Sequence, residues 1–140
     1  MRVVFDTSVI VSALRSRLGA SSVLLELAQA GHFEVLATPA LFLEYEEVVY
    51  RADQRIAHGL SDDLIDEFLR GLAAIMTPVR VYYQWRPQML DADDEMVLEA
   101  AINGKADRIV THNLRDFQAA VSRFRVSVVT PAIFLKEVRR

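Results

Sequence analysis

The sequence predicts an α/β fold built on a mainly parallel sheet. Short apolar runs, typical of buried strands, alternate from end to end with amphipathic segments typical of helices. No linker, repeat or low-complexity segment interrupts this alternation, and the length of 140 residues suits one domain spanning 1–140. Strands that alternate with helices form a parallel sheet through right-handed crossovers. In such sheets, functional sites form beyond the carboxyl ends of the strands.

The first part of the chain predicts a strand, two helices and a second strand. The apolar run Val3-Val4-Phe5 is typical of a short buried strand, which ends at Asp6. Residues that favour helix ends mark the two helices: Thr7 or Ser8 begins the first, Gly19 ends it, Ser21 or Ser22 begins the second, and Gly31 ends that one. Residues 33–37 are again apolar and predict the second strand.

The middle of the chain predicts two further helices. Thr38-Pro39 opens one of them, because proline fits a first helical turn, and its pattern continues to about Arg51. Ser61 and the two aspartates after it cap the next helix. Composition predicts the segments around them: a loop at 52–60, a third strand at 78–83 and an irregular stretch at 85–90.

The last part of the chain predicts two strands among three helices. A cluster of acids introduces the first of these helices, which runs to about Asn103 and is stopped by Gly104. Thr130-Pro131 opens the closing helix. Between them we expect a fourth strand at 108–111, a polar stretch at 112–116 that leads into a weak helix, and a fifth strand at 127–129.

Composition excludes several classes of function. The chain has no cysteine, which excludes disulfides and cysteine-based zinc sites. Its net charge of −3 argues against a protein that coats nucleic acid through bulk charge, although a nuclease can meet phosphates through bound cations. No apolar run reaches the roughly 20 residues of a membrane span, and no secretory signal follows Met1. We therefore expect a cytoplasmic protein without a membrane partner.

Two aspartates follow predicted strands. Asp6 stands at the end of the first strand, where a helix begins, and Asp116 closes a polar stretch just past the fourth. Aspartate is a common helix cap and turn residue, so each position alone fits a structural role as well as a functional one.

Two other acids flank apolar helical faces. Glu44 neighbours Leu41 and Val48 on the helix surface, although a boundary residue whose carboxylate reaches water explains Glu44 better when it is taken alone. Asp94 continues the buried face of Val97 and Leu98 into the first turn of its helix. A favourable interaction with the helix N-terminus explains why acids gather there, but not why one of them points inward.

Together, these four acids predict a metal site. Carboxylates from different elements repel one another at one place unless a cation separates them, and oxygen ligands suit Mg²⁺ or Mn²⁺. Such ions activate water and stabilise the charge of an in-line attack on phosphorus. The sequence has no glycine-rich nucleotide-binding loop and no serine elbow, and no lysine stands where an aspartyl-phosphate receiver would need it. Its histidines lack metal-ligand spacing: His32, His58 and His112.

The segments that carry these acids resemble the motifs of the PIN-domain family, and of VapC-like bacterial toxins in particular. The first motif is a hydrophobic strand ending in aspartate, followed by threonine or serine, and the second is a helix with glutamate ahead of paired apolar residues. The third is an aspartate that opens an alanine-rich helix, and the fourth follows a late strand. The matching segments, including a closing one similar to a toxin branch of the family, are 3–10, 44–51, 94–101, 106–117 and 129–135.

The resemblance implies a fold, an activity and partners. It implies a three-layer α/β/α domain with a central, mainly parallel sheet of about five strands, and a Mg²⁺- or Mn²⁺-dependent ribonuclease that cuts single-stranded RNA. It also implies a homodimer and a cognate antitoxin. On this basis the catalytic and metal-binding residues are Asp6, Glu44, Asp94 and Asp116, and the residues that orient them are Thr7, Ser8, Thr111 and Asn113.

One departure from the family pattern concerns the fourth motif. Many members carry an acid two residues after its threonine, where this chain has Asn113, whereas others place the acid before phenylalanine, as Asp116 is placed here. The fourth ligand is therefore carried over to Asp116. A non-catalytic PIN-fold binding or scaffold protein with a degenerate site is the alternative.

Basic and aromatic residues suggest where RNA and partners bind. Arginines near the motifs could contact phosphates, although a solvated surface role explains any one of them better when it is taken alone: they are Arg15, Arg17, Arg51 and Arg115. Apolar and aromatic residues could form an interface or cover the core: they are Ile65, Phe68, Leu69, Tyr82, Tyr83 and Trp85.

Overall fold

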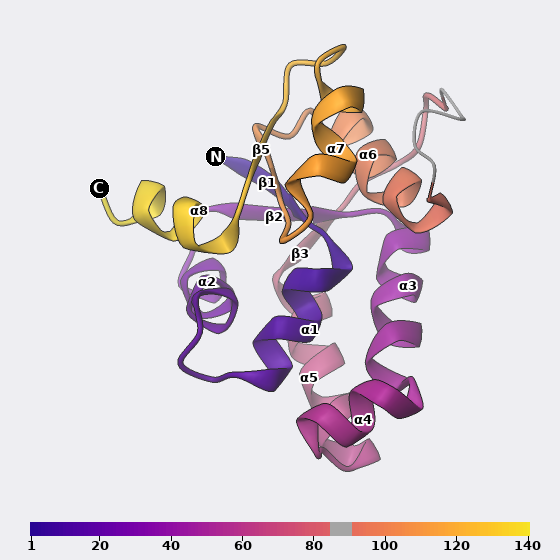
Figure 1. The fold of residues 1–140 in the computed structure, drawn as a ribbon, viewed down its shortest axis with the longest axis vertical. Coiled ribbons are helices and arrows are strands. Elements are labelled where there is room, and N and C mark those ends of the chain that lie inside the picture. The colour runs from indigo at the N-terminus through magenta and orange to yellow at the C-terminus, as the bar shows by residue number, and fades with distance from the viewer. Residues whose placement is uncertain (85–90) are drawn as a thin grey trace.

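Five short strands form one parallel sheet in the computed structural model, which describes residues 1–84 and 91–140 (Figure 1). The strand order is β3-β2-β1-β4-β5, and each neighbouring pair is parallel. This confirms the predicted sheet. The strands are β1 (Arg2–Phe5), β2 (Glu34–Ala37), β3 (Met76–Pro78), β4 (Arg108–Val110) and β5 (Ser127–Val129).

Helices cover both faces of the sheet, as expected for a three-layer domain. Figure 1 shows α6 and α7 on one face and α1, α2 and α5 on the other, while α3 contacts both α1 and α6. Val3, Val4 and Phe5 of the central strand are fully buried, because a strand covered on both faces has no polar side. The helices are α1 (Thr7–Arg15), α2 (Ala20–Gln29), α3 (Pro39–Tyr50), α4 (Ala52–His58), α5 (Asp62–Ile75), α6 (Ala92–Gly104), α7 (Leu114–Val121) and α8 (Pro131–Val138).

The order of the strands fixes where a site can form. From β1 the chain adds β2 and β3 toward one edge, then crosses back to place β4 and β5 on the other side of β1. The connections that leave β1 and β4 therefore run to opposite faces and open a crevice between the carboxyl ends of these two strands. Asp6 and Thr111 directly follow β1 and β4, so both residues stand at this crevice.

Three of the predicted helix caps are present and two are not. The side-chain oxygens of Thr38, Ser61 and Thr130 each accept a hydrogen bond from the backbone N–H of the third residue of α3, α5 and α8, respectively. By contrast, α1 and α2 begin after Asp6 and Gly19 with no side-chain cap. The predicted caps at Thr7 or Ser8 and at Ser21 or Ser22 are therefore wrong, and the hydroxyls of Thr7 and Ser8 bind Asp6 instead.

Two predicted segments also differ from the structure. Residues 52–60 were expected to be a loop, but they contain α4, which Gly59 ends in the left-handed conformation at φ 66°. The third strand lies at Met76–Pro78 and not at 78–83, because Met76 pairs with Val35 of β2 and the strand ends at a proline, which cannot donate to the ladder. The stretch expected to be irregular, 85–90, lies outside the described residues.

In the described part of the chain, no single helix is long and apolar enough to cross a membrane. Among the described residues, one pair of helices, α1 and α2, reaches that length and composition when taken together, and the two helices are bent by 102° relative to each other.

Gly104 does not stop α6 but lies within it. The left-handed residue at the helix end is Lys105, with φ 53°. A Cβ atom at Gly104 would lie 2.7 Å from the Leu36 side chain and 3.1 Å from that of Val79. The glycine is therefore required by the close approach of α6 to the sheet, which local sequence patterns do not reveal.

The two helical glycines of the fold predict opposite effects of alanine. Gly104→Ala should lower the free energy of unfolding by about 1 kcal/mol, because overpacking in a buried contact outweighs the better helix propensity of alanine. Gly71→Ala in α5 should raise it by about 0.5 to 1 kcal/mol, since nothing lies within 4 Å of the added Cβ. Urea denaturation of the two variants measures both changes, and a stabilised Gly104→Ala protein would contradict the packing argument.

Candidate active site

Asp6 is a buried carboxylate held by hydroxyl groups. Its side chain is only 3% exposed at the start of α1, although it accepts no capping hydrogen bond from a backbone N–H of the helix. One carboxylate oxygen, Oδ2, accepts hydrogen bonds from Ser8 at 2.8 Å and from Thr111 at 2.7 Å, and Oδ1 accepts one from Thr7 at 3.4 Å. The capping interpretation of Asp6 is therefore wrong, because its side chain points into the crevice.

The loop after β4 continues this hydrogen-bond network. Thr111 is fully buried, and its hydroxyl also accepts a hydrogen bond from the backbone N–H of Asn113 at 3.0 Å. The backbone N–H of His112 donates to the Ser8 hydroxyl at 3.3 Å. The three predicted hydroxyl residues thus contact Asp6 directly, whereas Asn113 joins the network through its backbone and its side chain is exposed.

Tyr45 fastens α3 to the central strand. Its buried hydroxyl donates a hydrogen bond to the backbone carbonyl of Phe5, one residue before Asp6. Burial, and then the negative charge of Asp6, raises the pKa of the Tyr45 hydroxyl well above its ordinary value. The hydroxyl therefore stays protonated as a donor, and it fixes α3 and its neighbouring residue Glu44 against the end of β1.

Glu44 points inward and lacks a full set of partners. Its side chain is 6% exposed, and within the described chain its buried Oε1 atom has no hydrogen-bond partner. Arg51 is the cation beside it, with an N–O distance of 3.7 Å. Burial raises the pKa of the Glu44 carboxyl, Asp93 and Glu47 raise it further, and Arg51 lowers it. The expectation that this carboxylate reaches water is wrong.

Asp94 lies closest to the meeting point of the acids. Burial, and then the charges of Asp6, Asp91, Asp116 and Asp93, together raise the pKa of its carboxyl to about 7. Carboxylates from β1, α6 and α7 therefore act on one group. Asp116 is an exposed residue in the first turn of α7 and does not lie in the loop before it.

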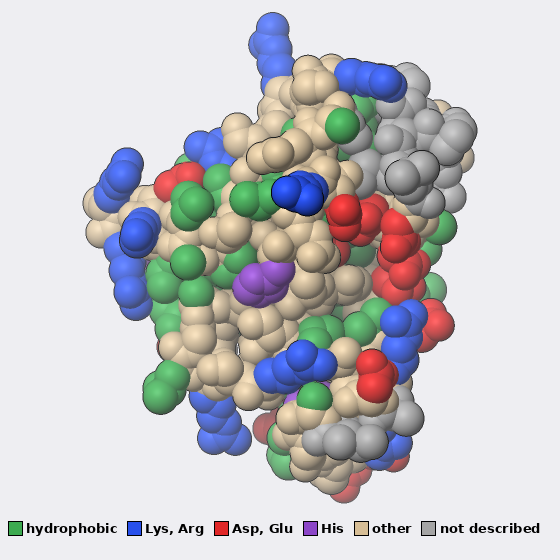
Figure 2. Space-filling model, in the orientation of Figure 1, with side chains coloured by type: hydrophobic (Ala, Val, Ile, Leu, Met, Phe, Trp, Pro, Cys, Tyr) green, Lys and Arg blue, Asp and Glu red, His purple; other side chains and the backbone are tan. Residues whose placement is uncertain are grey.

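The structure brings Asp6, Asp94 and Asp116 within electrostatic reach of one another, and it connects Glu44 to them through Asp93, without forming a ready coordination sphere. Figure 2 shows acidic side chains gathered where α3, α6 and α7 meet, with basic side chains on either side. Within residues 1–84 and 91–140, no three His, Asp or Glu side chains are arranged so that they could hold a metal ion. The donors nevertheless suit a hard divalent cation, because all are carboxylate oxygens and one of them, the buried Oε1 of Glu44, has no hydrogen bond within the described chain.

Sequence reasoning missed Asp93. The charge of Asp93 adds to burial in raising the pKa of the Glu44 carboxyl, as does a hydrogen bond that the two carboxyl groups can share when one of them is protonated. Asp93 was assigned to the helix N-terminus with its acidic neighbours, but only Asp91 acts as a cap there, accepting from the backbone N–H of Asp93 at 2.8 Å. The feature of the sequence that could have indicated Asp93 was its position next to the predicted ligand Asp94.

The four candidate arginines lie in different places. Arg51 lies beside Glu44, and Arg115 is exposed next to Asp116 on α7. Arg15 lines a polar hollow that shares Thr7 and Ser8 with the acidic centre. Arg17, two residues later, lines a different, apolar groove.

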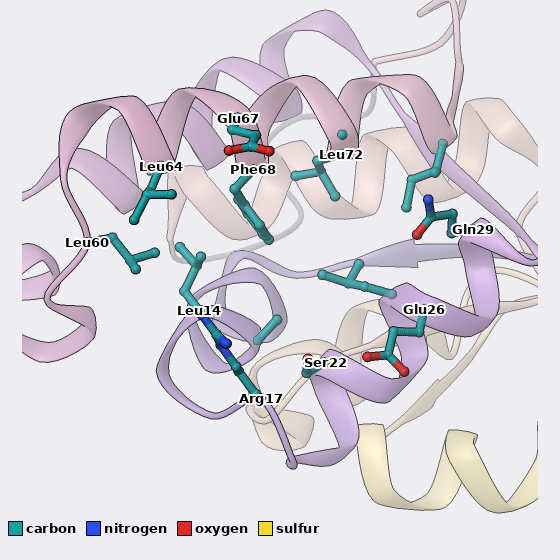
Figure 3. Close-up of a pocket in the computed structure, with 14 residues that line it drawn as sticks. Leu14, Arg17, Ser22, Glu26, Gln29, Leu60, Leu64, Glu67, Phe68 and Leu72 are labelled. Carbon is teal, nitrogen blue, oxygen red and sulfur yellow. The ribbon is translucent and has the colours of Figure 1, made fainter.

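This apolar groove separates α5 from α1 and α2. Figure 3 shows Leu64, Phe68 and Leu72 of α5 facing Leu14 of α1, with Glu26 and Glu67 at the rim. Its volume is about 420 Å³. The candidate interface residues divide accordingly: Ile65 and Leu69 belong to the core, Phe68 lines the groove, Tyr82 and Tyr83 are exposed, and Trp85 lies outside the described residues.

The sequence profile of the PIN domain matches residues 2–115. The chain therefore belongs to the PIN domain family, as its motifs suggested. PIN domains are generally nucleases and typically bind divalent metals. The matched segment contains Asp6, Glu44 and Asp94 and ends one residue before Asp116. A search of curated proteins finds no match.

Burial and the neighbouring aspartates predict that the charged Asp94 carboxylate lowers the free energy of unfolding at neutral pH. Its carboxyl pKa rises from 3.8 to about 7 on folding, so the folded protein binds this proton more tightly than the unfolded chain does. The resulting stability is present below about pH 4 and is lost as the pH rises to about 7. Asp94→Asn should therefore raise the free energy of unfolding at pH 7.5 by roughly 1 to 2 kcal/mol after solvent screening, and have little effect at pH 4.

Asp63→Asn is the matched control, because Asp63 is an exposed acid in the first turn of α5. Chemical denaturation at both pH values, in the presence of a chelator, measures the difference. An equal effect of Asp94→Asn at pH 4 and pH 7.5 would show that the charge of Asp94 does not destabilise the folded protein.

Proposed function

We propose that the protein is a metal-dependent endoribonuclease that hydrolyses phosphodiester bonds of single-stranded RNA in the cytoplasm, as the toxin of a type II toxin–antitoxin module. The observation that carries the proposal is the convergence of Asp6, Asp94 and Asp116 at the crevice between β1 and β4, where burial, and then the charges of Asp6, Asp116 and nearby aspartates, raise the pKa of the Asp94 carboxyl to about 7. Glu44, buried and incompletely partnered, faces the same region from α3.

The residues divide the work by position. Asp6 and Asp94 would hold the cation directly, Glu44 would hold it or orient the attacking water, and Asp116, which is exposed, would act through water. When bound, Mg²⁺ or Mn²⁺ supplies an activated water and offsets the charge that develops on the phosphate. Hydroxyl groups on Thr7, Ser8 and Thr111 fix the rotamer of the Asp6 carboxylate, as partners of metal ligands commonly do.

Partners follow from the same proposal. We propose that the chain forms a homodimer and binds a cognate antitoxin. Tyr82 and Tyr83, together with Leu64 at the mouth of the apolar groove, expose apolar surface of the kind found at interfaces. An antitoxin arginine placed among the carboxylates would form bidentate pairs with them and block the site.

The alternative is a non-catalytic PIN-fold binding protein. Two observations favour it: the exposed side chain of Asn113 and the lack, among the described residues, of three groups already arranged around a metal. Metal binding distinguishes the two proposals without any assay of RNA.

The nuclease proposal predicts that Asp6→Asn abolishes cleavage. The substitution keeps the shape of the side chain and an oxygen that can accept from Ser8 and Thr111, but it removes the charge that holds the cation. Cleavage of single-stranded RNA in Mg²⁺ or Mn²⁺ should fall at least about 100-fold, and a chelator should stop the wild-type reaction. Gel analysis of a labelled RNA measures the rate. The control Asp63→Asn should cleave at the wild-type rate, and cleavage by Asp6→Asn protein as fast as by wild type would refute the site.

A metal titration predicts stabilisation. Binding of Mn²⁺ only to the folded state, at ten times its dissociation constant, should raise the melting temperature by about 3 °C through mass action and through relief of the repulsion between carboxylates. Asp94→Asn should reduce this shift, because it removes one ligand. The absence of any shift at millimolar Mn²⁺ would favour the non-catalytic alternative.

A further inference from the structure

A polar hollow of about 470 Å³ lies beside the acidic centre. One wall is a face of α1 and the other walls come from α3, α4 and the loop after β4. Its volume lies within the range of small-ligand sites. We name it the α1 hollow, because most of its polar lining comes from α1. The polar residues that line it are Thr7, Ser8, Ser12, Arg15, Gln54 and His112.

The α1 hollow is continuous with the acidic centre. Ser8 lines the hollow, and its hydroxyl donates to the Asp6 carboxylate at 2.8 Å and accepts from the backbone N–H of His112 at 3.3 Å. An RNA strand whose scissile phosphate lies at the acidic centre can therefore place the neighbouring nucleotide in this hollow. The apolar groove on the other side of α1 offers no such path, because neither Ser8 nor His112 lines it.

Inside the hollow, Arg15 and Gln54 form a pair that presents donors. The Arg15 guanidinium donates to the Gln54 amide oxygen at 2.8 Å. Because arginine can only donate, the amide oxygen must face it, and the amide NH₂ group of Gln54 is turned away. Within the described chain, Arg15 has no carboxylate partner, so its remaining N–H groups and its charge are available to a phosphate.

We propose that the α1 hollow binds the nucleotide next to the scissile phosphate and prefers a keto base, uracil or guanine. The proposal rests on the ribonuclease function proposed above. Uracil presents the acceptor O4 and guanine the acceptor O6, whereas cytosine and adenine present amino donors at the equivalent positions. The Gln54 NH₂ group is a donor, so it can pair with the keto oxygen of uracil or guanine. With cytosine or adenine it would face an amino group, which is also a donor. Arg15 contacts the backbone and does not distinguish among bases.

Binding of two short RNAs tests the preference without cleavage. Ten-residue oligouridine and oligocytidine differ mainly in the group at C4, so they isolate the proposed contact. In the presence of a chelator, the wild-type protein should bind labelled oligouridine about 10-fold more tightly than oligocytidine. Gln54→Ala should abolish this ratio. Gln54→Glu, which keeps a carbonyl-type acceptor for Arg15 but turns the donor into an acceptor, should reverse it.

Controls separate base recognition from charge and from folding. Arg15→Ala should weaken both RNAs alike, several-fold, because it removes a phosphate contact. Gln29→Ala removes an amide from the apolar groove, and Arg70→Ala removes a charge from the far side of α5; both should bind as wild type does. Melting temperatures confirm that each variant is folded.

Cleavage-site mapping on a randomised single-stranded RNA completes the test. With Mn²⁺ present, wild type should enrich uracil or guanine at one position beside the cut, and Gln54→Ala should lose that enrichment while it continues to cut. Equal affinity of wild type for the two oligonucleotides, or an unchanged ratio in both Gln54 variants, would overturn the proposed recognition even if Asp6→Asn abolishes cleavage. If the chain cuts no RNA, the function fails, while the chelator experiment still decides whether the hollow reads the base.

Discussion

Repulsion among carboxylates is the constraint on which this structure depends. The strand order places the ends of β1 and β4 at one crevice, and α3, α6 and α7 add further acids around it. Asp94 bears the result most directly, since burial and four neighbouring aspartates act on its carboxyl. A fold that forces charges of one sign together must neutralise them with protons or with a cation. Near neutral pH protons are scarce, which makes a divalent cation the more effective solution.

The scaffold treats its two most buried candidate ligands differently. Asp6 accepts three hydroxyl hydrogen bonds, which hold its carboxylate in one orientation. Among the described residues, Oε1 of Glu44 has no hydrogen-bond partner and only forms an ion pair with Arg51 at 3.7 Å, and burial raises the pKa of the Glu44 carboxyl. The Asp6 carboxylate is therefore fixed by hydrogen bonds, whereas the Glu44 carboxylate is buried with one oxygen that lacks a hydrogen bond. This difference is what a site needs if one ligand anchors a cation and another exchanges between cation and water.

The sequence predicted those features that local chemistry decides. The sheet, the caps at Thr38, Ser61 and Thr130, and the approach of Asp6 and Asp116 to Asp94 follow from short patterns and from the geometry of parallel strands. The helix α4 was missed because it is short and polar, although Gly59 marks its end. Long-range packing decided the rest: the contact of Gly104 with Leu36, and the contact between Asp93 and Glu44, join elements that no local pattern connects.

Helix α1 connects the parts of the molecule that the site requires. It begins directly after Asp6, its polar face lines the α1 hollow, and its apolar face lines the groove against α5. Arg15, the last residue of α1, lines the α1 hollow, whereas Arg17, just beyond the helix, lines the apolar groove. Val9 and Ile10 are fully buried between these faces, so the helix cannot shift without disturbing the core. The same nine residues therefore fix the position of the Asp6 carboxylate and the shape of both neighbouring surfaces.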